Sequence, residues 1–111
     1  MKVEAATHAG PDALQREGLA SRRAATWRVD LPAAVYGLMF VMGDAAEETW
    51  PRLALAGHGA WRPATPIVAG RRATPVLSVA LEREGPVEIT FESSDPARYR
   101  WTCCGLFIRR L

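Results

Sequence analysis

Proline and glycine interrupt this sequence at short, fairly even intervals from Leu31 onward, and this spacing limits the fold more than any other feature. The interruptions that bound the segments are Pro32, Gly43, Pro51, Gly57, Gly59, Pro63, Pro66, Gly70, Pro75, Gly85, Pro86 and Pro96. Short segments between turn residues are typical of a β-sandwich or barrel, and they leave little room for long helices. The sequence therefore predicts an all-β, antiparallel β-sandwich.

Hydrophobic alternation within the segments favours the same fold. Apolar residues alternate with polar or small ones in three segments: Trp27, Val29 and Leu31; Leu77, Val79 and Leu81; Val87, Ile89 and Phe91. This period of two predicts strands with one buried and one exposed face. With a strand marked by Leu53 and Leu55 and a short one at 66–69, we expect six to eight strands.

The segment 34–42 (AVYGLMFVM) is apolar at its odd-numbered and its even-numbered positions alike. A strand of this kind is expected at the centre of a sheet and covered on both faces, with Gly37 allowing a neighbouring group to come close.

In the last segment, 99–111, the apolar residues shift from odd-numbered to even-numbered positions. Tyr99, Trp101 and Cys103 share one face, whereas Leu106 and Ile108 fall on the other. A β-bulge near Cys104 would return both groups to one side of the sheet, so we predict a bulge there.

Chain length and composition indicate one folded domain over 1–111. The chain has 111 residues, 49% of them apolar, and a net charge of +2, which excludes a disordered chain. We expect residues 1–24 to pack on the sandwich as a short helical or irregular segment, with up to two helical turns at 11–19, and residues 25–111 to supply the main strands. The apolar run 31–43 is too short to span a membrane as a helix.

The residues offer little for catalysis. No serine lies in a Gly-x-Ser-x-Gly motif, and neither His8 nor His58 has a recognisable partner pattern, so we expect no enzyme activity. The adjacent Cys103 and Cys104 are expected to be two separate buried thiols rather than a redox pair, and they lack the spacing of a zinc site.

No cofactor is expected, although calcium is an alternative. Asp44, Glu47 and Glu48 fall in one segment between strands and could supply the oxygen ligands that calcium prefers. A solvated acidic loop is the simpler interpretation.

Tryptophans in predicted loops and arginines near the ends of segments are the best candidates for binding. Loop tryptophans can stack on sugar rings, and arginines can hold hydroxyl or acidic groups. The candidate ligand-binding residues are Trp50, Trp61, His58, Arg71, Arg98 and Arg100. Loop packing for the tryptophans, an exposed turn for His58 and scattered solubilising charge for the arginines are the alternatives. The slight charge, without a basic and aromatic motif, excludes nucleic acid as a partner.

Three stretches resemble a known family. The first is Asp12-Ala-Leu-Gln-Arg-Glu-Gly18. The second begins with Trp27-Arg-Val-Asp-Leu-Pro32, continues through Val35-Tyr36 and ends at Gly43-Asp44. The third is Trp101 with Gly105-Leu106-Phe107-Ile108. They look like the patterns D-x-L-x-x-D-G, F-x-V-D-L-P-N-G-x-Y and W-x-x-x-G-L-x-I of galactose-binding-like (jelly-roll) β-sandwich domains attached to polysaccharide lyases and carbohydrate esterases. Ala33-Ala34 replaces the family's Asn-Gly turn, and Glu84-Gly85-Pro86 replaces its Asp-Gly.

The resemblance implies a jelly roll without an active site that helps a larger enzyme hold polysaccharide. The expected function is thus a non-catalytic carbohydrate-binding module, with an acidic polysaccharide as the candidate ligand and an attached catalytic domain of a carbohydrate-active enzyme as a further partner. The alternative is a structural or protein-interaction sandwich, which a wide apolar patch on one sheet face would favour. No secretory signal is visible at the start, so we expect a cytosolic protein, a mature form or an excised domain, the last two extracellular or periplasmic if the parent enzyme is secreted.

Overall fold

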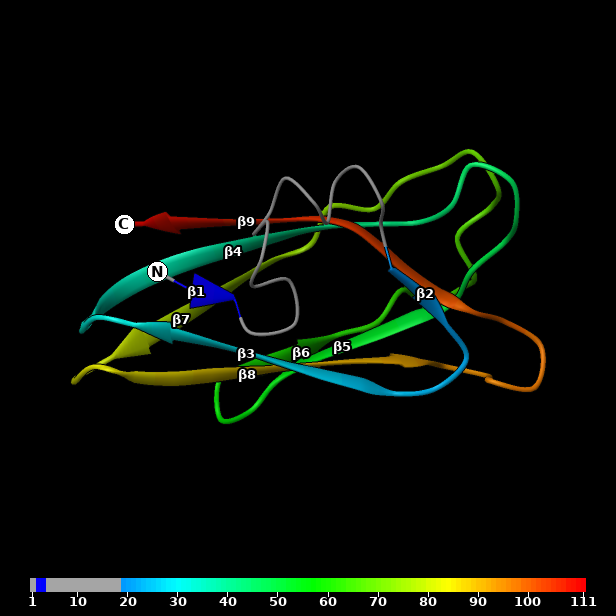
Figure 1. Cartoon of the computed structure of the whole chain (residues 1–111). Coiled ribbons are helices and arrows are strands. Elements are labelled where there is room, and N and C mark those ends of the chain that lie inside the picture. The colour runs from blue at the N-terminus through cyan, green and yellow to red at the C-terminus, as the bar shows by residue number, and fades with distance from the viewer. Residues whose placement is uncertain (1, 4–18) are drawn as a thin grey trace.

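Two antiparallel sheets face each other and enclose the core (Figure 1). The computed structural model describes residues 2–3 and 19–111, which contain nine strands. They are β1 (Lys2–Val3), β2 (Leu19–Ser21), β3 (Ala25–Leu31), β4 (Ala34–Met42), β5 (Pro51–Leu55), β6 (Gly59–Trp61), β7 (Val76–Leu81), β8 (Gly85–Ser93) and β9 (Trp101–Arg110).

The strand order is that of a jelly roll. Sheet A has the order β1-β3-β8-β5-β6, and sheet B has the order β2-β9-β4-β7. Strands that follow one another in the chain mostly cross to the opposite sheet, so each sheet interleaves early and late strands, as in two linked Greek keys. The predicted antiparallel β-sandwich is confirmed.

The core lies between the inner faces of the two sheets. The alternation predicted for β3 and β8 is observed, because Trp27, Val29 and Leu31 on β3 are buried. On β8, Val87, Ile89 and Phe91 are buried as well. Trp101 enters from β9 and stacks on Phe91, which also contacts Trp27 and Phe40 edge to face. Burial of this aromatic group joins the two sheets.

The bulge predicted in β9 is confirmed. Val41 pairs with Gly105, whereas the next residue, Met42, pairs with Cys103, so Cys104 is the extra residue. Trp101 and Cys103 before the bulge, and Leu106 after it, are therefore all buried on the inner face.

The expectation for β4 is wrong in one respect. The strand is central in sheet B, between β9 and β7, but its outer face is not buried like a core. Val35 is 47% exposed, and Met39 and Val41 are half-buried. The apolar residues on the outer face of β4 therefore form part of the molecular surface.

Two further expectations concern the number of strands and the N-terminal segment. The described residues contain nine strands rather than six to eight, and Ile67 forms only an isolated bridge with Thr49 where a short strand was expected at 66–69. The helical turns predicted at 11–19 lie outside the described residues, except for Leu19, which begins β2. No helix capable of crossing a membrane occurs in the described part of the chain.

Candidate functional site

The long connections of the sandwich gather at one end. Segments 22–24, 43–50, 62–75 and 94–100 all lie where β4 and β8 finish and β3, β5 and β9 begin, and we call this the loop end (Figure 1). The opposite end carries the short turns 32–33, 56–58 and 82–84.

The structure brings four of the six predicted binding residues together at the loop end. Trp50, Arg71, Arg98 and Arg100 lie on three of its segments. Trp61 is the last residue of β6, where its half-buried side chain packs against the core. His58 lies in the turn 56–58 at the opposite end, so it cannot share a site with the other candidates. His8 lies outside the described residues.

Trp50 is held firmly in place at the loop end. Its Nε1 donates to the Pro63 carbonyl oxygen at 3.0 Å, and its ring meets Tyr99 edge to face with centroids 5.9 Å apart. The backbone N–H of Trp50 donates to the Arg100 carbonyl at 3.1 Å, and its own carbonyl accepts from Ser94 N at 2.7 Å. These contacts tie three loop-end segments into one rigid unit.

The arginines surround this aromatic pair. The Arg98 guanidinium lies 5.6 Å from the centre of the Tyr99 ring, a cation–π contact. Arg100 forms an exposed ion pair with Glu47 at 3.9 Å, which leaves most of its hydrogen-bonding capacity to solvent. Arg71 is exposed on the segment that approaches Gly43.

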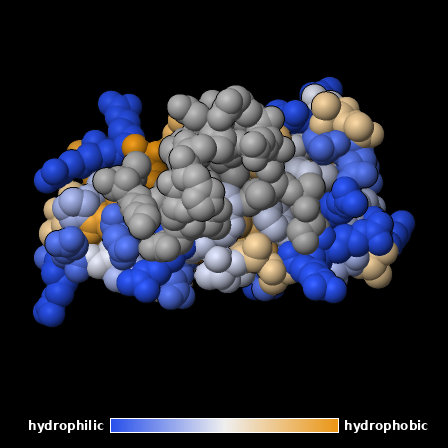
Figure 2. Space-filling view, viewed as in Figure 1, coloured by the Kyte–Doolittle hydropathy of each residue, from blue (hydrophilic) through white to orange (hydrophobic). Residues whose placement is uncertain are grey.

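The loop end carries an excess of positive charge. Its four segments contain seven arginines, at 22, 23, 62, 71, 72, 98 and 100, and four carboxylates, at 44, 47, 48 and 95. Figure 2 shows mainly hydrophilic surface at this end of the molecule. A rim of this composition favours polar and anionic ligands.

The acidic residues of the loop end do not converge on a cation. Asp44 Oδ2 accepts from the backbone N–H groups of Ala46 and Glu47 at 2.8 and 2.9 Å, and the Glu47 carboxylate faces Arg100. Within residues 2–3 and 19–111, no three histidine, cysteine or acidic side chains are grouped to hold a metal ion. Two of the three carboxylates considered for calcium, Asp44 and Glu47, therefore make contacts within the loop end.

The two thiols lie in different environments. Cys103 is buried and its Sγ donates to the Gly105 carbonyl, whereas Cys104 is half-buried and its Sγ donates to the Gly43 carbonyl. Both cysteines are free, and burial raises the pKa of the Cys103 thiol to about 12. Cys103 is thus a core residue rather than a nucleophile.

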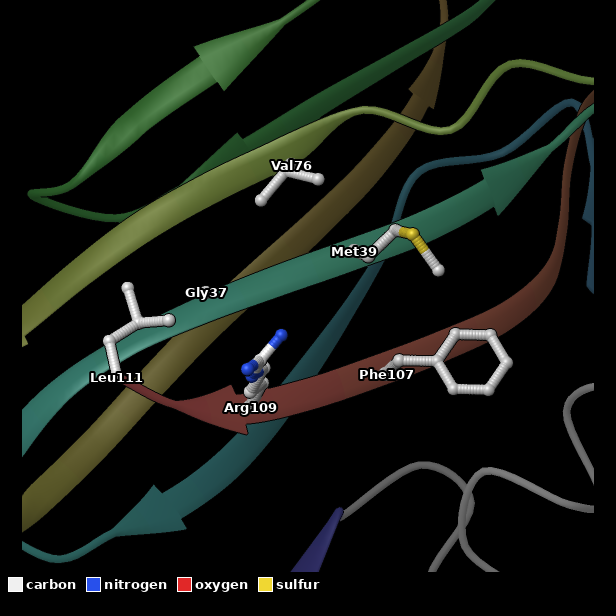
Figure 3. Close-up of a pocket in the computed structure, with 6 residues that line it drawn as sticks. All are labelled: Gly37, Met39, Val76, Phe107, Arg109 and Leu111. Atoms are coloured by element: carbon white, nitrogen blue, oxygen red, sulfur yellow. The ribbon is translucent and has the colours of Figure 1, made fainter.

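A second surface feature lies on the outer face of sheet B, and none of the predicted binding residues belongs to it. It is a hollow of about 350 Å³ lined by Gly37, Met39, Val76, Phe107, Arg109 and Leu111, which we call the Gly37 hollow (Figure 3). The two apolar parities of segment 34–42 and the glycine within it were the sequence signal for this feature. Taken alone, this pattern predicts a second buried face, whereas these residues lie on the surface of sheet B.

Strand register explains the shape of the hollow. Gly37 pairs with Arg109 on β9 and with Ser78 on β7, so the missing side chain leaves a depression in the middle of three strands. Figure 3 shows Phe107 and Arg109 along β9 on one side of Gly37 and Val76 on the other, with Leu111, the residue after the end of β9, beside Gly37 over β4. Phe107 is 40% and Val76 is 60% exposed, so the rim is accessible.

Comparisons with known proteins give a likeness in structure alone. No family model and no curated protein matches the chain. A solved structure described as "Family 16 Carbohydrate Binding Module-2" superposes with a TM-score of 0.49 at 10% sequence identity, over 84% of this chain and 74% of that one. Any function therefore has to be inferred from the residues of the chain itself.

Proposed function

We propose that this domain is a non-catalytic carbohydrate-binding module that holds its ligand at the loop end and serves as an accessory to a carbohydrate-active enzyme. The observation that supports the proposal is the rigid group of Trp50 and Tyr99 with Arg98 and Arg100 beside them. Half-buried aromatic rings bind the apolar faces of sugars, and guanidinium groups donate to hydroxyl and carboxylate oxygens. The resemblance of the sequence to galactose-binding-like domains supports the same class.

The charge of the loop end points to an acidic polysaccharide. Seven arginines against four carboxylates favour a uronate or sulfate ester over a neutral sugar. The binding side chains are already held in place in the free protein, because a main-chain hydrogen bond fixes Trp50 relative to Arg100. We expect modest affinity, since an open site exchanges hydrogen bonds with water.

Calorimetry with polygalacturonate and with a neutral galactan tests this function. We expect saturable binding of the acidic polymer that weakens with added salt and falls about tenfold in the double variant Arg98→Ala/Arg100→Ala. Arg83→Ala and His58→Ala are matched controls at the opposite end of the sandwich, and both should bind as the parent protein does. An absence of binding to both polymers, or an equal loss in the controls, would contradict the proposal.

A second candidate function is protein interaction through sheet B. The observation that favours it is the exposed apolar side chains on the outer face, Val35, Val76 and Phe107. An apolar sheet face is the expected mark of an interaction surface. Light scattering after size-exclusion chromatography distinguishes self-association, at twice 12.1 kDa, from a monomer.

A further inference from the structure

We propose that the Gly37 hollow binds a small apolar carboxylate, of the alkyl carboxylate class, independently of the loop end. The hollow has three properties that together select such a ligand: apolar walls, a floor without a side chain, and one cation at its edge.

The walls select the apolar part of the ligand. Met39, Val76, Phe107 and Leu111 are four of the six lining residues, and Phe107, Val76 and Leu111 remain substantially exposed. Burying such surface releases water and is favourable in proportion to the apolar area covered. A volume of about 350 Å³ lies at the low end of the range of small-molecule sites.

The floor permits a ligand to reach the sheet. A Cβ built at Gly37 would meet only the ends of the Val76 and Leu111 side chains at 3.8 Å, so no steric conflict in the sheet explains why this position is glycine. Any larger side chain there would instead occupy the hollow.

Arg109 selects the anionic part of the ligand. It lines the hollow beside Gly37, and its guanidinium makes no ion pair or hydrogen bond with the described residues, 2–3 and 19–111. A guanidinium next to apolar walls favours a carboxylate, because charge-assisted hydrogen bonds strengthen where water is partly excluded. A second copy of the chain fits less well, since a two-fold axis through the hollow would bring two Arg109 side chains together.

Titration of ¹⁵N-labelled protein with hexanoate tests the inference. We expect saturable shifts of the Gly37, Met39 and Arg109 amide signals at millimolar concentrations, and weaker binding of hexanamide, which lacks the charge, and of galacturonate, which lacks the alkyl chain. Arg109→Gln should weaken hexanoate binding about tenfold, and Phe107→Ala should weaken it as well. Gly37→Val should abolish binding by filling the hollow.

Matched controls keep this test separate from that of the loop end. Arg110→Gln makes the same charge change on the neighbouring residue of β9, whose side chain has the opposite parity and does not line the hollow, and it should bind hexanoate as the parent does. Arg98→Ala/Arg100→Ala should also leave hexanoate binding unchanged. The inference is overturned if hexanoate gives no saturable shifts, if Arg109→Gln binds equally well, or if light scattering shows a dimer that Phe107→Ala dissociates.

Discussion

Phe91 on β8 and Trp101 on β9 stack nearly parallel across the core, with ring centroids 4.9 Å apart and planes at 13°. Because β8 belongs to sheet A and β9 to sheet B, this pair joins the two layers directly. The Trp101 Nε1 also donates to the Arg23 carbonyl at 2.8 Å, which ties the connection between β2 and β3 to the same point.

Removal of the Phe91 ring should destabilise the protein strongly. Phe91 is fully buried and contacts three other aromatic rings, so Phe91→Ala leaves a cavity that its neighbours cannot close. We expect a loss of about 3–5 kcal/mol in the free energy of unfolding, measured by urea denaturation. Phe107→Ala, the same change at an exposed position of β9, should cost less than about 1 kcal/mol. Equal losses would show that the core does not depend on this pair.

The close approach of two loop-end segments requires glycine at position 43. Gly43 has a φ of 123°, and a Cβ at this position would collide with the Arg71 carbonyl oxygen. We expect Gly43→Ala to lower stability by roughly 2–3 kcal/mol through strain and collision together. Gly57→Ala is the control, because Gly57 also has a positive φ, 77°, but has open space around it. It should cost about 1 kcal/mol from strain alone, and thermal unfolding of both variants checks the difference.

The buried Cys103 thiol should make stability depend on pH in the alkaline range. Burial, the largest cause, raises its pKa in the folded protein from 9.0 to about 12. Between these values the unfolded chain has lost the proton and the folded chain retains it, so stability is complete below pH 9 and falls as the pH rises toward 12. The slope should approach that of one proton, about 1.4 kcal/mol per pH unit.

Cys103→Ala isolates this contribution. The variant has a lower stability at neutral pH but lacks the thiol, so its free energy of unfolding should depend less on pH between 9 and 12 than that of the parent protein. Identical slopes in the two proteins would contradict the assignment. In the same range, iodoacetamide should modify the half-buried Cys104 before Cys103.

Asp44 should contribute more to the loop end than the neighbouring ion pair. Its Oδ2 accepts two backbone hydrogen bonds, from Ala46 and Glu47, so Asp44→Ala should destabilise the protein by about 1 kcal/mol. Asp44→Asn retains an acceptor and should restore much of the loss. Glu47→Gln removes only the exposed pair with Arg100 and should cost less than about 0.5 kcal/mol in urea denaturation. The reverse order would mean that charge, rather than the turn, holds this segment.

The sequence alone determined the long strands and their inner faces, although it missed short strands such as β6. Trp27, Val29 and Leu31 alternate with polar or small residues, and the parity change after Cys103 required an extra residue in β9. These predictions succeeded because successive side chains of a strand point to opposite faces, so the position of a residue along the strand shows which face it lies on. Turn residues in the sequence placed Trp50 in a loop and Arg71, Arg98 and Arg100 at the ends of segments, but they could not show that these places meet at one end of the sandwich.

Only the tertiary structure decided which residues far apart in the chain come together. His58 and Trp50 both lie near glycine and proline in the sequence, yet strand direction sends His58 to the opposite end of the sandwich. The outer residues of β4 are as apolar as its inner ones, and their exposure follows from the absence, in the described residues, of a third layer over sheet B. Pairing of Gly37 with Arg109 created a hollow from residues more than 70 positions apart, because the residues of one strand do not determine which other strand becomes its neighbour in the sheet.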